Sequence, residues 1–246
     1  MDLASNTVLI TGGASGIGFA LAERFLQAGS EVIICGRRED KLREAKEAHP
    51  QITIRVCDVE AAPGRLSLFN WAVGEFPRLN VLVNNAGVQH RNVRLADAEL
   101  ARTRQEIAIN FEAPVHLSSL FIPHFLKQKR AAIVNVTSGL AFAPMASTPI
   151  YCATKAALHS FTLSLRHQLA ETRIRVVEIV PPAVNTDLGG VGLHTFGVPV
   201  NEFADGVMAR IKNGDLEVAF GPSEHLRRAS RAELDELFSR MNQSAR

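Results

Sequence analysis

The sequence predicts an α/β protein with a doubly wound, mostly parallel sheet of seven strands and helices on both faces of the sheet. Short β-branched runs alternate with longer amphipathic stretches along all 246 residues. The short runs are almost continuously apolar, which is typical of parallel strands that are covered on both faces. A glycine-rich turn joins the first apolar run to the first amphipathic stretch, as in folds that bind dinucleotides.

Seven short segments rich in Val, Ile and Thr are predicted to be strands. In chain order they are Thr7–Ile10, Glu31–Cys35, Ile52–Val56, Val81–Asn84, Ala132–Thr137, Arg175–Val180 and Glu217–Phe220. Parallel neighbours need crossover connections, so we expect right-handed units whose helices cover both sides of the sheet.

The intervening stretches have the apolar spacing of helices. Ile17, Ala20, Leu21 and Phe25 form one stripe, and Gly29 follows as a stop signal. A further helix is expected from the apolar residues of segment 66–76, and others around 99–126 and 152–170. No linker, repeat or low-complexity segment divides the chain, so residues 1–246 are interpreted as a single domain.

Composition and charge exclude several classes of function. The net charge of +2 is too small to indicate binding to nucleic acid or to a membrane surface. The N-terminal residues lack the pattern of a secretory signal, and no apolar run approaches the roughly 18 residues of a membrane span. The cysteines are odd in number and far apart, which indicates reduced thiols and a cytoplasmic location. No histidine spacing supports a metal site.

The turn Thr11-Gly12-x-x-x-Gly16-x-Gly18 is expected to hold a pyrophosphate. Glycines let the backbone approach the phosphates, and the N-terminus of the next helix attracts their charge. A tight turn that merely needs glycine is the alternative. The nucleotide site is favoured by the context of the turn. A predicted strand precedes it, a predicted helix follows it, and a second predicted strand comes directly after that helix.

Two arginines follow the second strand and favour NADP over NAD. A site for NAD would place an acidic residue at the strand end to bind the ribose hydroxyl, but here the chain has Gly36, Arg37 and Arg38. Guanidinium groups suit a 2′-phosphate and can stack on adenine. Two solvated arginines at the start of a charged helix are the alternative.

Tyr151, the only tyrosine, is followed four residues later by Lys155, so the two side chains would share one helix face. Taken alone, the pair is best explained as a partly buried surface tyrosine with a lysine near it. Its interpretation changes when the other motifs are considered together.

These motifs, in this order, resemble the short-chain dehydrogenase/reductase family, in its branch of about 250 residues. The resemblance extends from about residue 5 to about residue 190 and implies a Rossmann-type fold. Asn110, Ser138, Tyr151 and Lys155 match the family's catalytic tetrad. The strings VTSGLAF, YCATKAALHSF, LRHQL and PPAV are also similar to those of oxidoreductases that accompany teichoic-acid D-alanylation genes in some Gram-positive bacteria.

The resemblance implies an oxidoreductase that uses NADP(H) to interconvert a carbonyl and an alcohol of a small molecule. It also implies a set of cofactor-binding residues: Gly12, Ser15, Gly16, Ile17, Gly18, Arg37, Arg38, Asp58, Val59, Asn85, Ala86, Gly87, Tyr151, Lys155, Pro181, Val184 and Thr186. One departure affects this set. The family usually has Pro-Gly beside the nicotinamide, whereas this chain has Pro181-Pro182, and proline lacks the N–H and the freedom of glycine.

In the family's reaction Tyr151 exchanges the proton, and Lys155 is expected to lower its pKa. A useful base needs a pKa roughly two to three units below that of free tyrosine, or about 3–4 kcal/mol. A phenolate and an ammonium about 4 Å apart gain on the order of 4 kcal/mol at an effective dielectric constant of about 20. Ser138 would bind the substrate oxygen, with capping of a turn as its alternative role. Asn110 is expected at a local kink in a helix, with a buried structural role as its alternative.

Substrate choice is assigned to a lid over about residues 185–205, where Leu188, Val191, Leu193 and Phe196 suggest apolar walls. A capping box, Ser230-x-x-Glu233, predicts a C-terminal helix over about 230–242. Its apolar stripe either packs on its own domain or docks on a second subunit. Family members commonly pair, so a homodimer or homotetramer is expected.

Two other functions remain open from the sequence. One is an NADP(H)-binding regulatory or scaffold protein without turnover, suggested by Pro182 and by the lack of a substrate motif. The other is a nucleotide-sugar epimerase, although such chains are usually longer than this one.

Overall fold

The seven predicted strands form one sheet in which every pair of neighbours is parallel. The computed structural model describes residues 1–91 and 93–243. The strands are β1 (Thr7–Thr11), β2 (Glu31–Gly36), β3 (Thr53–Val56), β4 (Val81–Asn84), β5 (Ala131–Val136), β6 (Ile174–Val180) and β7 (Glu217–Ala219). Their order across the sheet is β3-β2-β1-β4-β5-β6-β7, which confirms the doubly wound fold.

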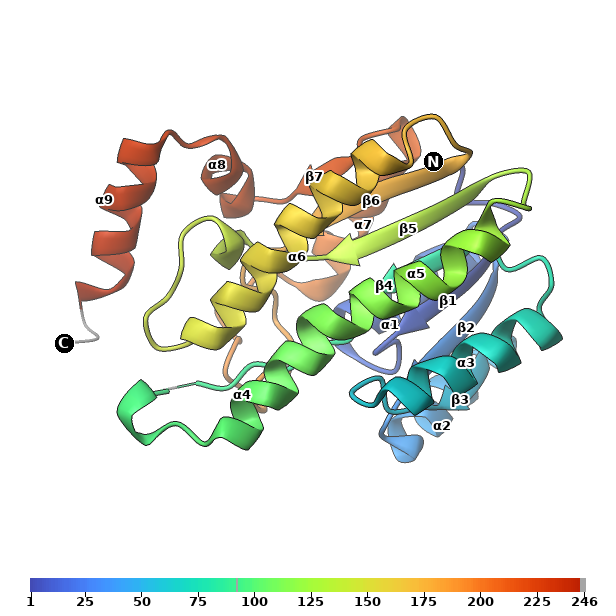
Figure 1. Cartoon of the computed structure of the whole chain (residues 1–246), viewed down its shortest axis with the longest axis horizontal. Coiled ribbons are helices and arrows are strands. Elements are labelled where there is room, and N and C mark those ends of the chain that lie inside the picture. The colour runs from blue at the N-terminus through green and yellow to red at the C-terminus, as the bar shows by residue number, and fades with distance from the viewer. Residues whose placement is uncertain (92, 244–246) are drawn as a thin grey trace.

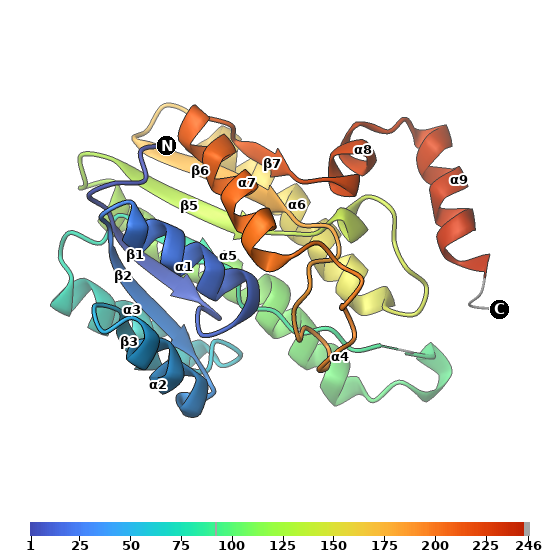
Figure 2. The same cartoon turned by 180° about the vertical axis from the view of Figure 1, so that it is seen from behind.

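Helices cover both faces of this sheet. They are α1 (Gly16–Gln27), α2 (Glu39–Ala48), α3 (Ala62–Glu75), α4 (Leu100–Ile107), α5 (Ala113–Phe125), α6 (Pro149–Gln168), α7 (Val200–Asn213), α8 (Pro222–Arg228) and α9 (Arg231–Met241). Helices α3, α5 and α6 lie on the face seen in Figure 1, and α1, α2 and α7 on the face seen in Figure 2. Within the described part of the chain, no helix has the length and apolar character needed to cross a bilayer.

Successive residues of β1 enter two different hydrophobic cores, one on each face of the sheet. Val8 and Ile10 pack in the core that contains Phe25 of α1. Leu9, between them, packs in the core that contains Phe121 of α5. Each such fully buried side chain contributes about 1.5–3 kcal/mol. This burial on both faces explains why the strands read as continuous apolar runs.

The order of the strands also determines where a ligand can bind. β1 lies beside β4, and the chain moves outward from this pair in opposite directions. In open parallel sheets such a reversal leaves a crevice at the carboxyl ends of the strands. The candidate residues that follow β1, β4 and β5 are therefore brought to the same edge.

The lid is shorter than predicted. The irregular segment ends at Pro199, because α7 begins at Val200, so residues 200–205 are helical. A parallel bridge between Val184 and Val198 closes the base of the segment, and the N–H of Val198 donates to the oxygen of Ala183 at 2.9 Å. This bridge brings the two ends of the loop together before the helix starts.

The predicted C-terminal helix is α9, and its capping box between Ser230 and Glu233 is present. It projects from one end of the molecule in both views (Figures 1 and 2). None of its residues is buried, and the side chain of Phe238 is 42% exposed. The apolar stripe is therefore not buried within its own domain in this structure, and its docking on a second subunit stays a prediction.

Candidate functional site

The glycine-rich turn is fixed to the end of β4 by hydrogen bonds. The Asn85 Nδ2 donates to the backbone oxygens of Thr11 at 2.9 Å and Gly12 at 3.1 Å. The Thr11 hydroxyl oxygen in turn accepts the N–H of Ala86 at 3.1 Å. Gly12 has φ +62°, and a Cβ there would lie 2.9 Å from the Cα of Ala86. Only glycine allows this close approach, so the turn and the segment after β4 form one rigid platform.

The N-terminus of α1 on this platform suits an anionic group. Ser15 is the N-cap residue, but no side chain caps the helix and its first turn contains no acidic residue. The N–H groups at the start of the helix, from Gly16, Ile17 and Gly18, can therefore serve a phosphate. Thr186 of the lid also reaches this point, because its Cγ2 lies 3.2 Å from the position of a Cβ on Gly16. The residues present fit the diphosphate of a dinucleotide.

Of the two arginines after β2, Arg38 lies against this turn. Its Nη2 donates to the Ser15 hydroxyl oxygen at 2.8 Å. Arg37 pairs instead with Glu60, with 3.7 Å between Nη1 and Oε2. β2 ends at Gly36, so no carboxylate occupies the strand end.

Two of the predicted cofactor-binding residues, Asp58 and Val59, follow β3. Asp58 is exposed, and its Oδ1 accepts the N–H of Glu60 at 3.0 Å, while Val59 is buried. This turn leaves a second carboxylate oxygen of Asp58 free of protein hydrogen bonds in the described residues.

Tyr151 and Lys155 lie on one face of α6, as their spacing predicts, and both are buried. The ammonium nitrogen is 5.6 Å from the centre of the tyrosine ring. It donates a hydrogen bond to the backbone oxygen of Val136, the last residue of β5, at 2.7 Å. Ser138 follows two residues later, and its hydroxyl accepts the N–H of Leu140 at 3.1 Å. Ser138 therefore has the capping role that was its alternative, in addition to its place beside the phenol.

The lowering of the Tyr151 pKa that was expected from Lys155 is not seen in this structure. Burial raises the pKa of Tyr151 above its ordinary value, and the opposing effect, a hydrogen bond with Ser138, is smaller. Burial likewise lowers the pKa of Lys155 to about 8. The lysine lies over the ring and donates to Val136, so desolvation of the phenol outweighs the attraction that the sequence argument relied on.

Asn110 lies in a single π-helical turn, Ala108–Glu112, between α4 and α5, where a local kink was expected. Such turns often occur at functional sites. Its Oδ1 accepts the N–H of Val88 at 2.9 Å, and its Nδ2 donates to the Val88 oxygen at 2.8 Å. A Cβ on Gly87 would lie 3.4 Å from this Oδ1 and 3.9 Å from the Lys155 nitrogen. Asn110, Gly87 and Lys155 thus meet at one point.

The segment with the two prolines remains attached to this edge of the sheet. The backbone oxygen of Pro181 accepts the N–H of Gly139 at 2.9 Å. Val184, three residues on, is buried and takes part in the bridge with Val198. The extra proline therefore does not displace the chain from β5.

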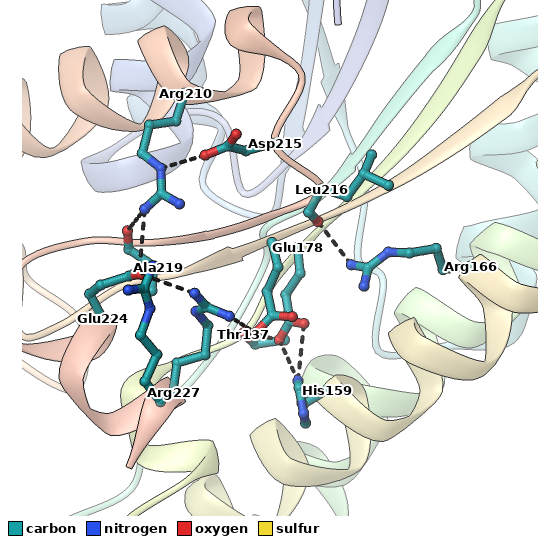
Figure 3. Close-up of polar contacts among 12 residues, drawn as sticks. Thr137, His159, Arg166, Glu178, Arg210, Asp215, Leu216, Ala219, Glu224 and Arg227 are labelled. Carbon is teal, nitrogen blue, oxygen red and sulfur yellow. Dashed lines mark hydrogen bonds and ion pairs between the residues drawn. The ribbon is translucent and has the colours of Figure 1, made fainter.

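Sequence reasoning missed a polar cluster beneath the serine. Figure 3 shows the carboxylate of Glu178, from β6, between Thr137 and His159. The Thr137 hydroxyl donates to Oε1 at 2.7 Å, and the His159 Nδ1 lies 2.9 Å from the same oxygen. The sequence contains a feature that could have indicated this cluster: Glu178 is the one acidic residue in the apolar run RVVEIV. Figure 3 also shows Arg210 bonded to Asp215 and to the oxygen of Ala219, which ties α7 to β7.

The lid does not form the apolar walls that were expected. The side chains of Val191 and Phe196 are largely exposed to solvent. A pocket of about 450 Å³ lies beside the lid and is lined mostly by polar residues of segment 89–106, together with Ile150 and Gly189.

In the described part of the chain, no three His, Cys, Asp or Glu residues form a group that could hold a metal ion.

The site can be compared with known proteins. Residues 6–191 match the family model described as short chain dehydrogenase. The chain is 50% identical, over 98% of both sequences, to an uncharacterized oxidoreductase of Bacillus subtilis, DltE, which confirms the resemblance found in the sequence. A metagenomic short-chain oxidoreductase solved with NADP is 26% identical with a TM-score of 0.77 over 89% of this chain and 98% of that one. A 3-ketoacyl-(acyl-carrier-protein) reductase from Brucella melitensis, solved with NADH, is 28% identical with a TM-score of 0.72 over 83% and 84%.

Proposed function

The chain belongs to the short-chain dehydrogenase family of oxidoreductases, and on this basis we propose that it uses NADP(H) to interconvert a carbonyl and an alcohol, with Tyr151 as the acid/base. One observation supports this most strongly: the three buried residues Ser138, Tyr151 and Lys155 lie at the same sheet edge as the uncapped N-terminus of α1. A nicotinamide cofactor is supported by family membership, since related structures contain NADP or NADH.

The chemistry of each residue follows from its surroundings. A bound nicotinamide supplies the hydride for the carbonyl carbon. The Tyr151 phenol supplies the proton for the carbonyl oxygen, and its raised pKa keeps that proton in place at neutral pH. The Ser138 hydroxyl, which interacts with the phenol, is placed to bind the same oxygen and to stabilise its developing negative charge. The protonated phenol is the form that donates the proton in carbonyl reduction, and the phenolate would be the form that accepts it in alcohol oxidation.

Asn110 and Lys155 act as positioning residues in this proposal. Lys155 fixes the end of β5 through Val136, and Asn110 fixes the segment after β4 through Val88. The edge between them would hold the nicotinamide ribose and ring, beside Asn85, Ala86 and Gly87. On the adenosine side, Arg38 at Ser15 supports a 2′-phosphate and so NADP.

The test measures oxidation of NADPH with a panel of ketones and aldehydes, for the wild type and for Tyr151→Phe. The variant keeps the ring but lacks the proton, so its kcat is expected to fall by about 10²–10⁴-fold. The dissociation constant of NADPH serves as the control and should change far less than kcat, because the variant keeps the ring. Undiminished turnover by the variant would exclude Tyr151 as the acid/base.

A regulatory protein that binds NADP(H) without turnover is a second candidate. Pro182 favours it, because this residue removes an N–H where the family usually has glycine beside the nicotinamide. Tight NADPH binding with no turnover across the panel would establish it. Turnover of any carbonyl compound that requires Tyr151 would exclude it.

A further inference from the structure

Buried polar atoms without hydrogen-bond partners cluster beside Tyr151. Seven side-chain nitrogen or oxygen atoms of the described residues are buried and unpaired, and four of them belong to Gln89, His90, Arg91 and His194. Gln89 and His194 are only 6% and 7% exposed. Buried polar groups are normally paired, and each one left unpaired costs about 1–3 kcal/mol, so a cluster of four indicates a place where a ligand supplies the partners.

Three of these residues line the pocket described above, and His194 reaches it through its contact with Arg91. Gln89, His90 and Arg91 line it, together with Glu106, Ile150 of α6 and Gly189 of the lid. Ile150 directly precedes Tyr151, and the charge of Glu106 is near enough to raise the pKa of that tyrosine. A ligand in this pocket would therefore lie against the first turn of α6, the turn that carries the proposed acid/base.

Arg91 forms no ion pair with a carboxylate within the described residues. Its Nη2 lies 3.3 Å from the His194 Nε2, and its Nε is buried and unpaired. Burial, and then the charge of Arg91, lower the pKa of His194, and a neutral imidazole can accept a hydrogen bond from the guanidinium but supplies no negative charge.

The acidic groups around the pocket have other partners or lie at its rim. Glu99 pairs with Arg102 at 2.9 Å, and Glu106 accepts the N–H of His90 at 3.0 Å. Asp97 is exposed. The guanidinium of Arg91 thus remains the group that needs a partner.

We propose that the substrate of this protein carries an acid group, a carboxylate or a phosphate, which binds Arg91 while its carbonyl faces Tyr151. The planar guanidinium matches either anion by paired N–H donors. The amide of Gln89, for which no protein partner is present in the described residues, is placed to bind another polar group of the same molecule. This inference depends on the proposed function, which locates the reaction at Tyr151.

The first experiment compares pairs of carbonyl compounds that differ only in charge. Acetoacetate is compared with methyl acetoacetate, and dihydroxyacetone phosphate with dihydroxyacetone, as substrates for NADPH oxidation by the full chain. We expect kcat/KM to be higher for the charged member of at least one pair. The pair that shows the preference distinguishes a carboxylate from a phosphate. Equal or lower values for both charged members would overturn the inference.

The second experiment identifies the residue responsible. In Arg91→Gln the ratio of kcat/KM for the charged over the neutral compound is expected to fall about 10- to 100-fold, because a charged hydrogen bond is lost. Arg104→Gln removes an equal charge from an exposed position of α4 outside the pocket and should keep the wild-type ratio. A ratio that Arg91→Gln leaves unchanged would overturn the inference.

A third measurement separates this inference from the proposed function. Calorimetry of the NADPH-loaded protein with acetoacetate and with dihydroxyacetone phosphate reports binding without turnover. Binding that weakens in Arg91→Gln but not in Arg104→Gln supports the anion site even if no compound is reduced. The opposite result is turnover of the neutral compounds while neither anion shows binding that depends on Arg91. That result would exclude the anion site and leave the oxidoreductase proposal intact.

Discussion

The Nδ1 of His159 lies 2.9 Å from Oε1 of Glu178, whose side chain is completely buried. The same oxygen accepts the hydroxyl of Thr137, the residue before Ser138. A buried carboxylate needs both hydrogen bonds and a compensating charge. His159, four residues beyond Lys155 on α6, supplies that charge when its imidazole is protonated. The pair therefore supports the end of the strand from which Ser138 extends.

This pair predicts a dependence of stability on pH. Glu178 raises the pKa of His159 in the folded protein above its unfolded value. The stabilisation is therefore complete below the unfolded pKa, and it is lost as the pH rises through the raised folded pKa. We expect the wild type to exceed His159→Gln in free energy of unfolding by about 1–3 kcal/mol at about pH 5.5, and by less at about pH 8.5.

Urea unfolding of both proteins at the two pH values measures this difference. Glutamine keeps an N–H donor, so the comparison isolates the charge. His167→Gln is the control, because His167 is exposed on the same helix. A gap that is constant across the pH range would contradict the prediction.

Arg38 predicts the choice of cofactor. Loss of its guanidinium beside Ser15 in Arg38→Gln is expected to lower kcat/KM for NADPH about 10- to 100-fold and to change that for NADH little. Arg43→Gln, an exposed substitution further along α2, should keep the NADPH preference. A wild-type protein that uses NADH as well as NADPH would show that the two arginines do not select a phosphate.

Substitution of Ser138 is expected to slow the chemical step. In Ser138→Ala the substrate oxygen loses a hydrogen-bond donor, so kcat is expected to fall about 10²–10³-fold. Leu140 also loses the acceptor for its N–H, at a cost of about 1 kcal/mol in stability. Ser160→Ala, an exposed substitution on α6, controls for both effects. If kcat stays within about twofold of the wild type, Ser138 only caps its turn.

The exposed apolar residues of helix α9 lead us to expect that the chain forms a homo-oligomer. Its exposed Phe238 and Met241 form an apolar surface that we propose is covered by a second copy of the chain. Light scattering should then give the mass of a dimer or tetramer for the wild type and a smaller mass for the double substitution Phe238→Ser and Met241→Ser. Val191→Ser, at an exposed apolar residue of the lid, should leave the mass unchanged. A monomeric wild type at micromolar concentration would reject this proposal.

Local patterns were sufficient to predict most of the architecture. Each strand was found within two residues of its observed bounds, because burial on both faces makes parallel strands continuously apolar. The capping box of α9 and the shared face of Tyr151 and Lys155 also follow from spacings of three and four residues. The end of the lid could not be found in this way, because it depends on the bridge between Val184 and Val198, which joins residues distant in sequence.

The sequence by itself determined the sheet, the glycine turn and the residues that meet at its edge, since these depend on backbone preferences and on periodic burial. Only the tertiary structure decided the pKa values and the hydrogen-bond partners of the charged groups at the site. Desolvation and partner choice depend on what surrounds a group in space, so the raised pKa of Tyr151, the contact of Arg38 with Ser15 and the buried Nε of Arg91, unpaired within the described residues, could not be derived from the order of residues.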